Sequence, residues 1–236
     1  MSERGIRLHV PDGLAEGAAV PLSPGQAHYL GSVMRQVVGA ELRVFNGRDG
    51  EWLARVEHLR KDRGGLAVVS RLREQAAGPD LWLIFAPLKR DATDLVAQKA
   101  TELGVAALLP VFTARTNAGR VNTDRLAAIA TEAAEQSERL TVPRVEQPSP
   151  MPDLLARWPA ERRLVVAAER RQAAPIRPAT GPAGLLVGPE GGFTDRELDV
   201  LVRHPFVEVA TLGPLILRAD TAAIVGLALL QATSGG

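Results

Sequence analysis

Short runs with the pattern of buried strands alternate with helical segments from residue 80 onward. The strand-like runs are residues 81–85, 106–109, 164–167, 185–187 and 207–209, and the helical segments are residues 91–103, residues 123–140 and two stretches that begin near Thr194 and Asp220. Most of these runs are continuously apolar, so their strands must be covered on both faces, and helical crossovers make such strands parallel. The alternation predicts an α/β domain built on a parallel sheet.

Three of the helical segments carry signals at their ends. Gly104 follows residues 91–103 and is expected to end that helix. Thr194 and Glu197 have the spacing of a capping box, in which each side chain bonds the backbone N–H of the other residue. Asp220 is expected to cap the last helix.

The first 73 residues have a different pattern. Strand-like runs at residues 42–45, 52–56 and 66–69 are separated by turns rich in glycine. A short helical segment lies within residues 23–38, and Gly39 is expected to end it. We expect a small β-barrel in residues 1–73, a linker with a Gly-Pro break in residues 74–79, and the α/β domain in residues 80–236.

Composition excludes several classes of protein. Hydrophobic residues make up 46% of the chain and charged residues 23%, which is far from the composition of a disordered protein. There is no cysteine, and the four histidines never have the spacing of a helical zinc pair, so we expect no metal. No run approaches the roughly 20 apolar residues of a membrane span, and the N-terminus lacks a signal peptide. We expect a cytoplasmic protein with no membrane partner.

Basic residues concentrate in the first part of the chain. Residues 1–73 hold 11 Lys or Arg against 8 Asp or Glu, although the whole chain carries a net charge of only +1. A cluster there is a candidate footprint for nucleic-acid phosphates: Arg55, Arg60, Lys61, Arg63, Arg71 and Arg73. The alternative is the solvated face of a small β domain.

The last helical segment, residues 221–230, is apolar on every face. Such a helix must be buried all round, and a chain of this length has limited core in which to bury it. We therefore expect a homodimer in which the partner subunit covers part of this helix. A central helix within a monomer is the alternative.

Two glycine-containing loops follow strands of the predicted sheet. The first, residues 188–193, lies where open α/β sheets bind ligands, and its glycines allow close approach to the backbone. It has neither the dinucleotide-binding spacing nor the lysine of a P-loop, so phosphate cofactors are disfavoured. The second, residues 211–218, is apolar and therefore expected to be buried. Two such loops would form a dry slot suited to an adenosyl ligand, although a tight turn with no ligand also explains the first.

The residues of these loops resemble a known family. Residues 188–193 (Gly-Pro-Glu-Gly-Gly-Phe) and 212–222 resemble the signature of the SPOUT methyltransferases that make N3-methyluridine in 16S ribosomal RNA. Residues 98–105, 113–116, 132–139 and 142–143 are similar to that family in order and spacing, as are residues 7–10, 28–30, 33–35 and 45–47. The resemblance covers nearly the whole chain.

The resemblance implies a PUA-like β-barrel that binds RNA, followed by a catalytic domain whose C-terminal trefoil knot holds S-adenosylmethionine at a homodimer interface. The substrate implied is 16S rRNA of the small ribosomal subunit. The residues assigned to the cofactor are Ala167, Ala168, Val187, Gly188, Pro189, Glu190, Gly191, Gly192, Leu212, Gly213, Leu215, Ile216, Leu217 and Ala222. The residues assigned to RNA are Arg7, His28, Arg35, Arg55, Arg60, Lys61 and Arg63.

Two positions depart from the family pattern. The family usually has Glu where this chain has Asp220, and residues 89–94 lack its usual Gly and Met. A role that needs the reach of glutamate is therefore in question at Asp220.

Transfer of a methyl group to N3 of uracil requires that the nitrogen lose its proton. An arginine that stabilises developing charge on the uracil oxygens would help, as would a carboxylate base. Arg218, Arg115 and Arg139 are the candidate arginines, and Glu190 and Asp220 are the candidate carboxylates. Three of them have a structural alternative: an ion pair within one helix to Glu135 for Arg139, turn stabilisation for Glu190 and helix capping for Asp220.

Three other functions stay open at this stage. A ribosome assembly factor with the same fold would not bind S-adenosylmethionine. A 2′-O-ribose methyltransferase of the same superfamily would place the methyl group on the sugar. A nucleotide-dependent oxidoreductase is disfavoured by the missing dinucleotide fingerprint.

Overall fold

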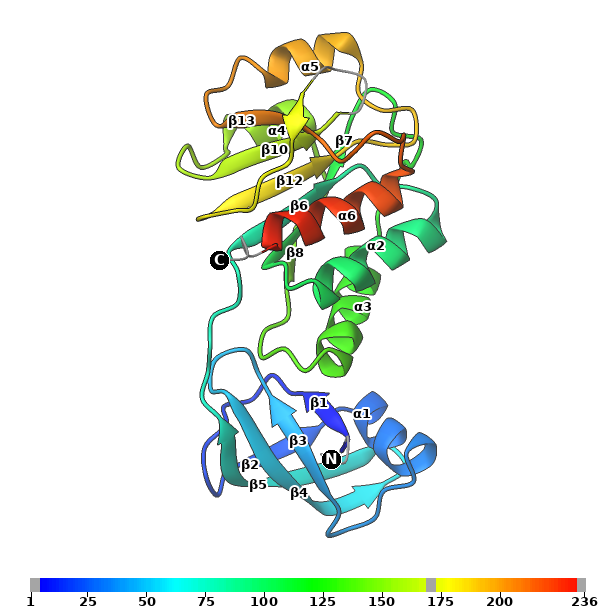
Figure 1. Cartoon of the computed structure of the whole chain (residues 1–236). Helices are drawn as coiled ribbons and strands as arrows, with labels where there is room; N and C mark the ends of the chain where they lie inside the picture. The colour runs from blue at the N-terminus through cyan, green and yellow to red at the C-terminus, as the bar shows by residue number, and fades with distance from the viewer. Residues whose placement is uncertain (1–4, 169–172, 233–236) are drawn as a thin grey trace. The chain divides into compact units, whose positions relative to one another are not determined.

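The computed structural model of the chain describes residues 5–168 and 173–232 (Figure 1). The chain forms two compact units, one of Met1–Ala77 with Ala134–Val142 and the other of Gly78–Ala133 with Pro143–Gly236. Residues 1–4, on which the expected absence of a signal peptide partly rests, lie outside the described residues. Within those residues, no helix is long and apolar enough to cross a membrane.

The first unit is built on a five-stranded sheet. Its strands are β1 (Arg7–His9), β2 (Ala19–Leu22), β3 (Glu41–Phe45), β4 (Glu51–Arg60) and β5 (Arg63–Arg73), hydrogen-bonded in the order β1-β3-β4-β5-β2. Only the β1–β3 pair is parallel. The core of this unit is formed by alternating strand residues together with helical Ala27 and Leu30.

The helical segment of this unit is shorter than predicted. Ser23 and Gln26 form a capping box that starts α1 (Pro24–His28), which continues as one π-helical turn, η1 (Tyr29–Val33). The predicted helix continues to residue 38, but Arg35 has a φ of 52°, a left-handed conformation that interrupts a right-handed helix.

A segment from the middle of the chain completes the first unit. Buried Arg7 pairs with buried Glu51 and also donates to the carbonyl oxygens of Ala134 at 2.7 Å and Arg139 at 2.5 Å. Arg43 pairs with the carboxylate of Glu138 at 2.9 Å. These bonds attach residues 134–142 to the sheet.

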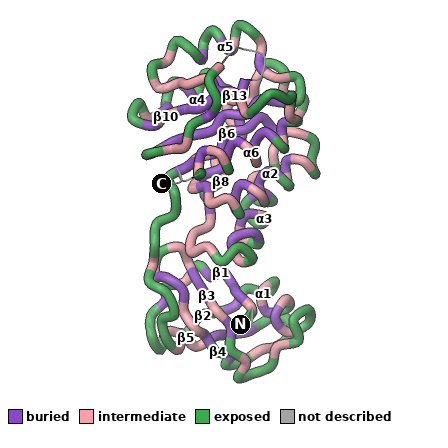
Figure 2. Tube along the Cα trace, in the orientation of Figure 1, coloured by how far each residue is buried: buried purple, intermediate pink, exposed green. Residues whose placement is uncertain are grey.

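The second unit is built on a parallel sheet, as predicted. Its strands are β6 (Leu81–Phe85), β7 (Ala107–Phe112), β8 (Arg144–Val145), β9 (Ser149–Pro150), β10 (Arg163–Ala167), β11 (Ala174–Pro175), β12 (Ala183–Val187) and β13 (Val207–Thr211). The order is β11-β13-β10-β12-β6-β7-β8, with β9 also paired to β7. Most residues of the central strands β10, β12 and β6 are buried (Figure 2), and β12 is buried at every position.

The helices of this unit are α2 (Arg90–Glu102), α3 (Thr123–Gln136, whose last residues belong to the first unit), α4 (Met151–Ala156), α5 (Asp195–Leu201) and α6 (Ala219–Gln231). The left-handed Gly104 follows α2, and the capping box of Thr194 and Glu197 starts α5, both as predicted. Helix α4 has no counterpart among the predicted segments.

Two predicted helix ends are wrong. Helix α3 ends at Gln136 instead of residue 140, because Glu138 has a φ of 58°. The N-cap of α6 is Arg218, so Asp220 does not cap that helix. Asp220 lies in the first turn and accepts a hydrogen bond from the backbone N–H of Thr221 at 2.7 Å.

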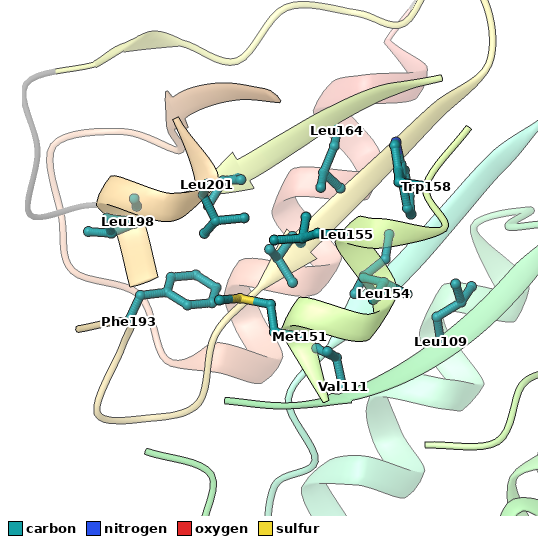
Figure 3. Close-up of a cluster of buried hydrophobic side chains, with 14 of the residues drawn as sticks. Leu109, Val111, Met151, Leu154, Leu155, Trp158, Leu164, Phe193, Leu198 and Leu201 are labelled. Atoms are coloured by element: carbon teal, nitrogen blue, oxygen red, sulfur yellow. The ribbon is translucent and has the colours of Figure 1, made fainter. Parts of the chain in front are cut away.

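Apolar side chains cover the two faces of the parallel sheet. Helices α4 and α5 contribute Met151, Leu154 and Leu198 to one cluster with the sheet, and Figure 3 shows Met151 and Phe193 pointing toward each other. Helix α6 packs on β12 and against α2. Its residues are not buried all round, since Thr221 and Ala228 are exposed.

Candidate functional site

A small cavity lies at the carboxyl ends of the neighbouring strands β10 and β12, which pair in parallel with Ala167 opposite Val187. Its volume is about 110 Å³. The residues around it are Ala167, Ala168, Val187, Gly188, Pro189, Glu190, Gly192, Phe193, Leu198, Ile216, Leu217, Ala219 and Ala222. Glu190 is the only ionisable residue in this set. The rest of the wall consists of backbone groups and apolar side chains.

The glycine loop after β12 is held in a defined conformation. Gly192 has a φ of 67° and donates to the carbonyl oxygen of Pro189 at 2.7 Å. A Cβ at Gly188 would lie 3.0 Å from the ring of Phe193, so a side chain there would press on the cavity wall. Arg115 also donates to the carbonyl oxygen of Gly191 at 2.7 Å.

The second loop is exposed, contrary to the prediction that it is buried. Thr211 anchors its start by donating to the carbonyl oxygen of Gly213 at 3.0 Å, and Gly213 has a φ of 137°. Leu215 and Ile216 then project with 73% and 83% of their surfaces exposed. Within the described residues of a single chain, nothing covers these side chains, which is the situation expected of a surface that a partner covers.

Ten of the fourteen residues assigned to the cofactor line the cavity. Gly191, Leu212, Gly213 and Leu215 do not line it, although they belong to the two loops that border it. Phe193, Leu198 and Ala219 line it and were not assigned from the sequence. Phe193 is the last residue of the glycine loop, a position from which it could have been assigned, whereas Leu198 carries only the pattern of a buried helix residue.

The four candidate catalytic residues differ in their surroundings. Glu190 is exposed at the cavity, Arg115 bonds the glycine loop, and Arg218 is exposed at the N-terminus of α6. Arg139 belongs to the first compact unit, where burial lowers the pKa of its guanidinium to about 10. Arg139 also lies beyond the end of α3, so it does not share one helix with Glu135; it donates to Thr141 Oγ1 at 3.0 Å.

A second and larger cavity shares a wall with the first. Its volume is about 530 Å³, and Pro189 and Glu190 line both cavities. The other residues around it come from the start of α2 and from the segment that leads into α3: Pro87, Leu88, Lys89, Arg90, Thr93, Asp94, Asn117, Ala118, Arg120, Val121, Asn122, Arg125 and Leu126. This cavity could not be predicted from the sequence, because its two walls are separated along the chain.

Most residues assigned to RNA are exposed on the first unit. Arg60, Lys61 and Arg63 lie at the β4–β5 hairpin, and His28 and Arg35 lie at and after α1. Arg55 is exposed as well and pairs with Glu41 at 3.0 Å.

Arg7 requires a correction. Only 6% of its surface is exposed, and its guanidinium is engaged by Glu51 and by main-chain carbonyl oxygens. The pKa of Arg7 is lowered by burial, against which the hydrogen bond to Glu51 acts. A side chain so enclosed cannot reach an RNA phosphate, so Arg7 is a structural residue.

The described residues contain no group of three or more His, Asp or Glu side chains that could hold a metal ion.

The fold and the cavities define a class of protein. The family model described as an RNA methyltransferase domain matches residues 76–231, and the one described as an RNA methyltransferase PUA domain matches residues 22–64. The parallel-sheet unit with its glycine-lined cavity and the small β unit are thus the two parts of an RNA methyltransferase.

Relatives define the family more narrowly. The chain is 34% identical over 230 residues to ribosomal RNA small subunit methyltransferase E of Rickettsia conorii, covering 94% of this chain and 93% of the relative. The chain belongs to the ribosomal RNA small subunit methyltransferase E family, which confirms the family resemblance found in the sequence.

Solved structures agree with this assignment. The enzyme of the same name from Neisseria gonorrhoeae, bound to S-adenosyl methionine, matches with a TM-score of 0.86 and 28% identity over 95% of each chain. A putative methyltransferase from Legionella pneumophila, in complex with the same cofactor, matches with a TM-score of 0.87 and 29% identity over 97% of each chain.

Proposed function

We propose that this protein transfers a methyl group from S-adenosylmethionine to N3 of a specific uridine in the 16S rRNA of the small ribosomal subunit. The observation that carries the proposal is the apolar, glycine-lined cavity at the carboxyl ends of β10 and β12, which shares Glu190 with a larger polar cavity. Membership of the family, and the cofactor bound in two related structures, support it.

The first cavity suits part of this cofactor. It lacks a lysine or arginine that would pair with a polyphosphate, and its backbone groups and small side chains fit a flat, uncharged ring. A complete small-molecule pocket measures roughly 300–1,000 Å³. A cavity of about 110 Å³ is therefore proposed to hold only the flat ring of the cofactor, while the rest of the cofactor lies along the exposed loop at Leu215 and Ile216.

When bound, S-adenosylmethionine supplies an electrophilic methyl group on a sulfonium sulfur. In the reaction the N3–C bond forms as the S–C bond breaks, and the N3 proton leaves. Glu190, which lines both cavities, is proposed to accept that proton, and Arg218 is proposed to stabilise charge that develops on the uracil oxygens.

The first unit is proposed to bind RNA through the exposed basic residues of its β4–β5 hairpin. The match to an RNA methyltransferase PUA domain over residues 22–64 supports this role. We further propose that the protein acts in the cytoplasm.

The exposed apolar loop supports a homodimer. Leu215 and Ile216 lie on the loop that leads into α6, and the outer side of α6 presents Ala228 to solvent. A partner subunit seated on this surface would cover the cavity as well as the apolar side chains.

The loop after β10 supports the trefoil knot. Ile176 donates to Thr211 at the end of β13, and Ala179 donates to Leu230 near the end of α6. Residues 176 and 179 therefore contact both ends of the segment that runs from β13 through α6, an arrangement that supports the knot implied by the family resemblance.

The test of the function is methylation of small subunits that lack the modification. Purified protein is incubated with them and labelled S-adenosylmethionine, and the digested RNA is analysed by mass spectrometry. Labelled N3-methyluridine, lost in Arg218→Ala, is the expected result. Label on ribose would indicate the 2′-O-methyltransferase, and the absence of cofactor binding would indicate an assembly factor.

A further inference from the structure

The larger cavity of the second unit has the properties of a nucleotide-binding site. Its volume of about 530 Å³ lies within the range of small-molecule pockets. It borders the first cavity at Pro189 and Glu190, so a group bound in it would lie next to the proposed cofactor site.

The charges around this cavity are predominantly positive. Lys89, Arg90 and Arg120 are exposed on its rim, and their side chains have no hydrogen-bond or ion-pair partner among the described residues. Helix α2 also begins at this rim without a side-chain cap, so its first backbone N–H groups add to the positive potential.

One further cation of the cavity is already neutralised. Arg125 donates to both carboxylate oxygens of Asp94, with bonds of 3.0 and 2.5 Å, and this contact raises the pKa of Arg125. Arg125 is thus already paired, and the cations left for a ligand are Lys89, Arg90 and Arg120. Three such cations match a ligand with more than one negative charge.

Two side-chain amides lie in the same wall. Asn122 accepts a hydrogen bond from the backbone N–H of Arg125 at 3.0 Å through its carbonyl oxygen, which leaves its NH₂ group available. Asn117 is exposed. The NH₂ group of an amide donates, and this matches the two carbonyl oxygens that flank N3 of uracil.

We propose that this cavity receives one uridine nucleotide extruded from the RNA. Its base is held by Asn117 and Asn122 with N3 toward Glu190, and its flanking phosphates are held by Lys89, Arg90 and Arg120. Enzymes that act on a base turn it out of the stack into such a pocket and recognise its edge. The inference rests on the proposed function and assigns the substrate-binding residues of the same site.

The test compares three variants with the wild-type protein. Lys89→Ala combined with Arg120→Ala removes two cations of the rim, and Asn117→Ala removes one amide. Arg196→Ala is the control, because Arg196 is an exposed arginine of α5 that lines neither cavity. S-adenosylmethionine affinity is measured by calorimetry, and methyl transfer to small subunits is measured in single turnovers over a range of subunit concentrations.

We expect the double variant to need about tenfold more subunit for half-maximal transfer, since each phosphate contact is charge-assisted. Asn117→Ala should instead slow transfer at saturating subunit. S-adenosylmethionine affinity should change less than twofold in all variants, and the control should match the wild type.

Either of two results would overturn this assignment. If the cavity variants transfer methyl groups as the wild type does, the cavity does not hold the nucleotide. If their S-adenosylmethionine affinity falls along with transfer, the cavity belongs to the cofactor. Failure of the proposed function itself is distinguishable, because the wild-type protein would then transfer no methyl group to any subunit before variants are compared.

Discussion

The guanidinium of Arg115 donates a hydrogen bond of 2.7 Å to the carbonyl oxygen of Gly191, and a longer one of 3.4 Å to that of Phe193. The side chain of Arg115 thus connects the segment that follows β7 with the glycine loop that follows β12. This contact assigns Arg115 a positioning role in addition to the catalytic one inferred from the sequence.

Arg115→Ala should therefore weaken S-adenosylmethionine binding, because the glycine loop loses two hydrogen bonds from a charged donor. Such bonds contribute about 1.5 kcal/mol or more, which corresponds to roughly a tenfold rise in the dissociation constant. Calorimetry measures the affinity and single turnovers measure the rate. An unchanged affinity with a reduced rate would favour direct action on the substrate instead.

Gly184 of β12 should tolerate no side chain. A Cβ there would lie 2.6 Å from the ring of Trp158, which is fixed by its hydrogen bond to the carbonyl oxygen of Arg162, and 2.9 Å from Ile84. We expect Gly184→Ala to lower the free energy of unfolding by about 1–3 kcal/mol, measured by chemical denaturation. Gly181→Ala is the matched control, because a Cβ there meets nothing within 4 Å. Equal effects of the two changes would contradict the packing argument.

The parallel sheet could be predicted because its strands are apolar on both faces, and this leaves a continuous signal in the sequence. The glycine loop that borders the small cavity could be located for a related reason, since glycines between a buried strand and a capped helix are distinctive. The predictions failed where a distant contact or a single backbone angle decides the structure. Arg35 and Glu138 adopt left-handed conformations, which are predicted from sequence mainly where the residue is a glycine.

The attachment of residues 134–142 to the first unit could not be predicted. It depends on Arg7, whose partners Glu51 and Ala134 are far from it in sequence, and an arginine in a basic region favours a surface interpretation. The exposure of Leu215 and Ile216 was missed because an apolar loop is normally buried, and a single chain does not contain the surface that would cover it.

The Glu51 carboxylate should make stability depend on pH. Burial, the largest effect, raises its pKa, but hydrogen bonds from Arg7 and Arg73 outweigh burial and hold the pKa below its ordinary value of 4.5. A carboxylate with a lowered pKa stabilises the fold above its unfolded-state pKa, and the contribution is lost as the pH falls below about 4.5.

Glu51→Gln should therefore reduce the loss of stability on acidification. It should also lower the free energy of unfolding at pH 7 by about 3–5 kcal/mol, because Arg7 would be left buried without its counter-charge. Glu41→Gln is the control, since Glu41 and Arg55 form an exposed pair that contributes at most about 1 kcal/mol. Denaturation curves across the pH range measure both effects, and similar results for the two variants would refute the role of burial.

Leu215 should contribute to association of two subunits. Leu215→Asp replaces an apolar side chain that is 73% exposed, so the isolated chain should fold normally while the dimer weakens about tenfold or more. Sedimentation over a range of concentrations measures the change. Leu72→Asp, at a leucine of β5 that is 46% exposed, should leave association unaffected. A wild-type protein that sediments as a monomer at all concentrations would exclude the proposed homodimer.

The basic hairpin between β4 and β5 should determine how RNA binding depends on salt. Each phosphate contact releases counterions, so replacing Arg60 and Lys61 by Ser should make the slope of log affinity against log salt concentration shallower by about 0.7–0.9 per residue. Arg48→Ser is the control, because Arg48 lies in the β3–β4 turn at the opposite end of β4 and is 60% exposed at its side chain. Binding measured between low and moderate salt gives the slopes. If the hairpin variant keeps the wild-type slope, these residues do not contact phosphates, and the basic residues serve only as the solvated edge of the sheet.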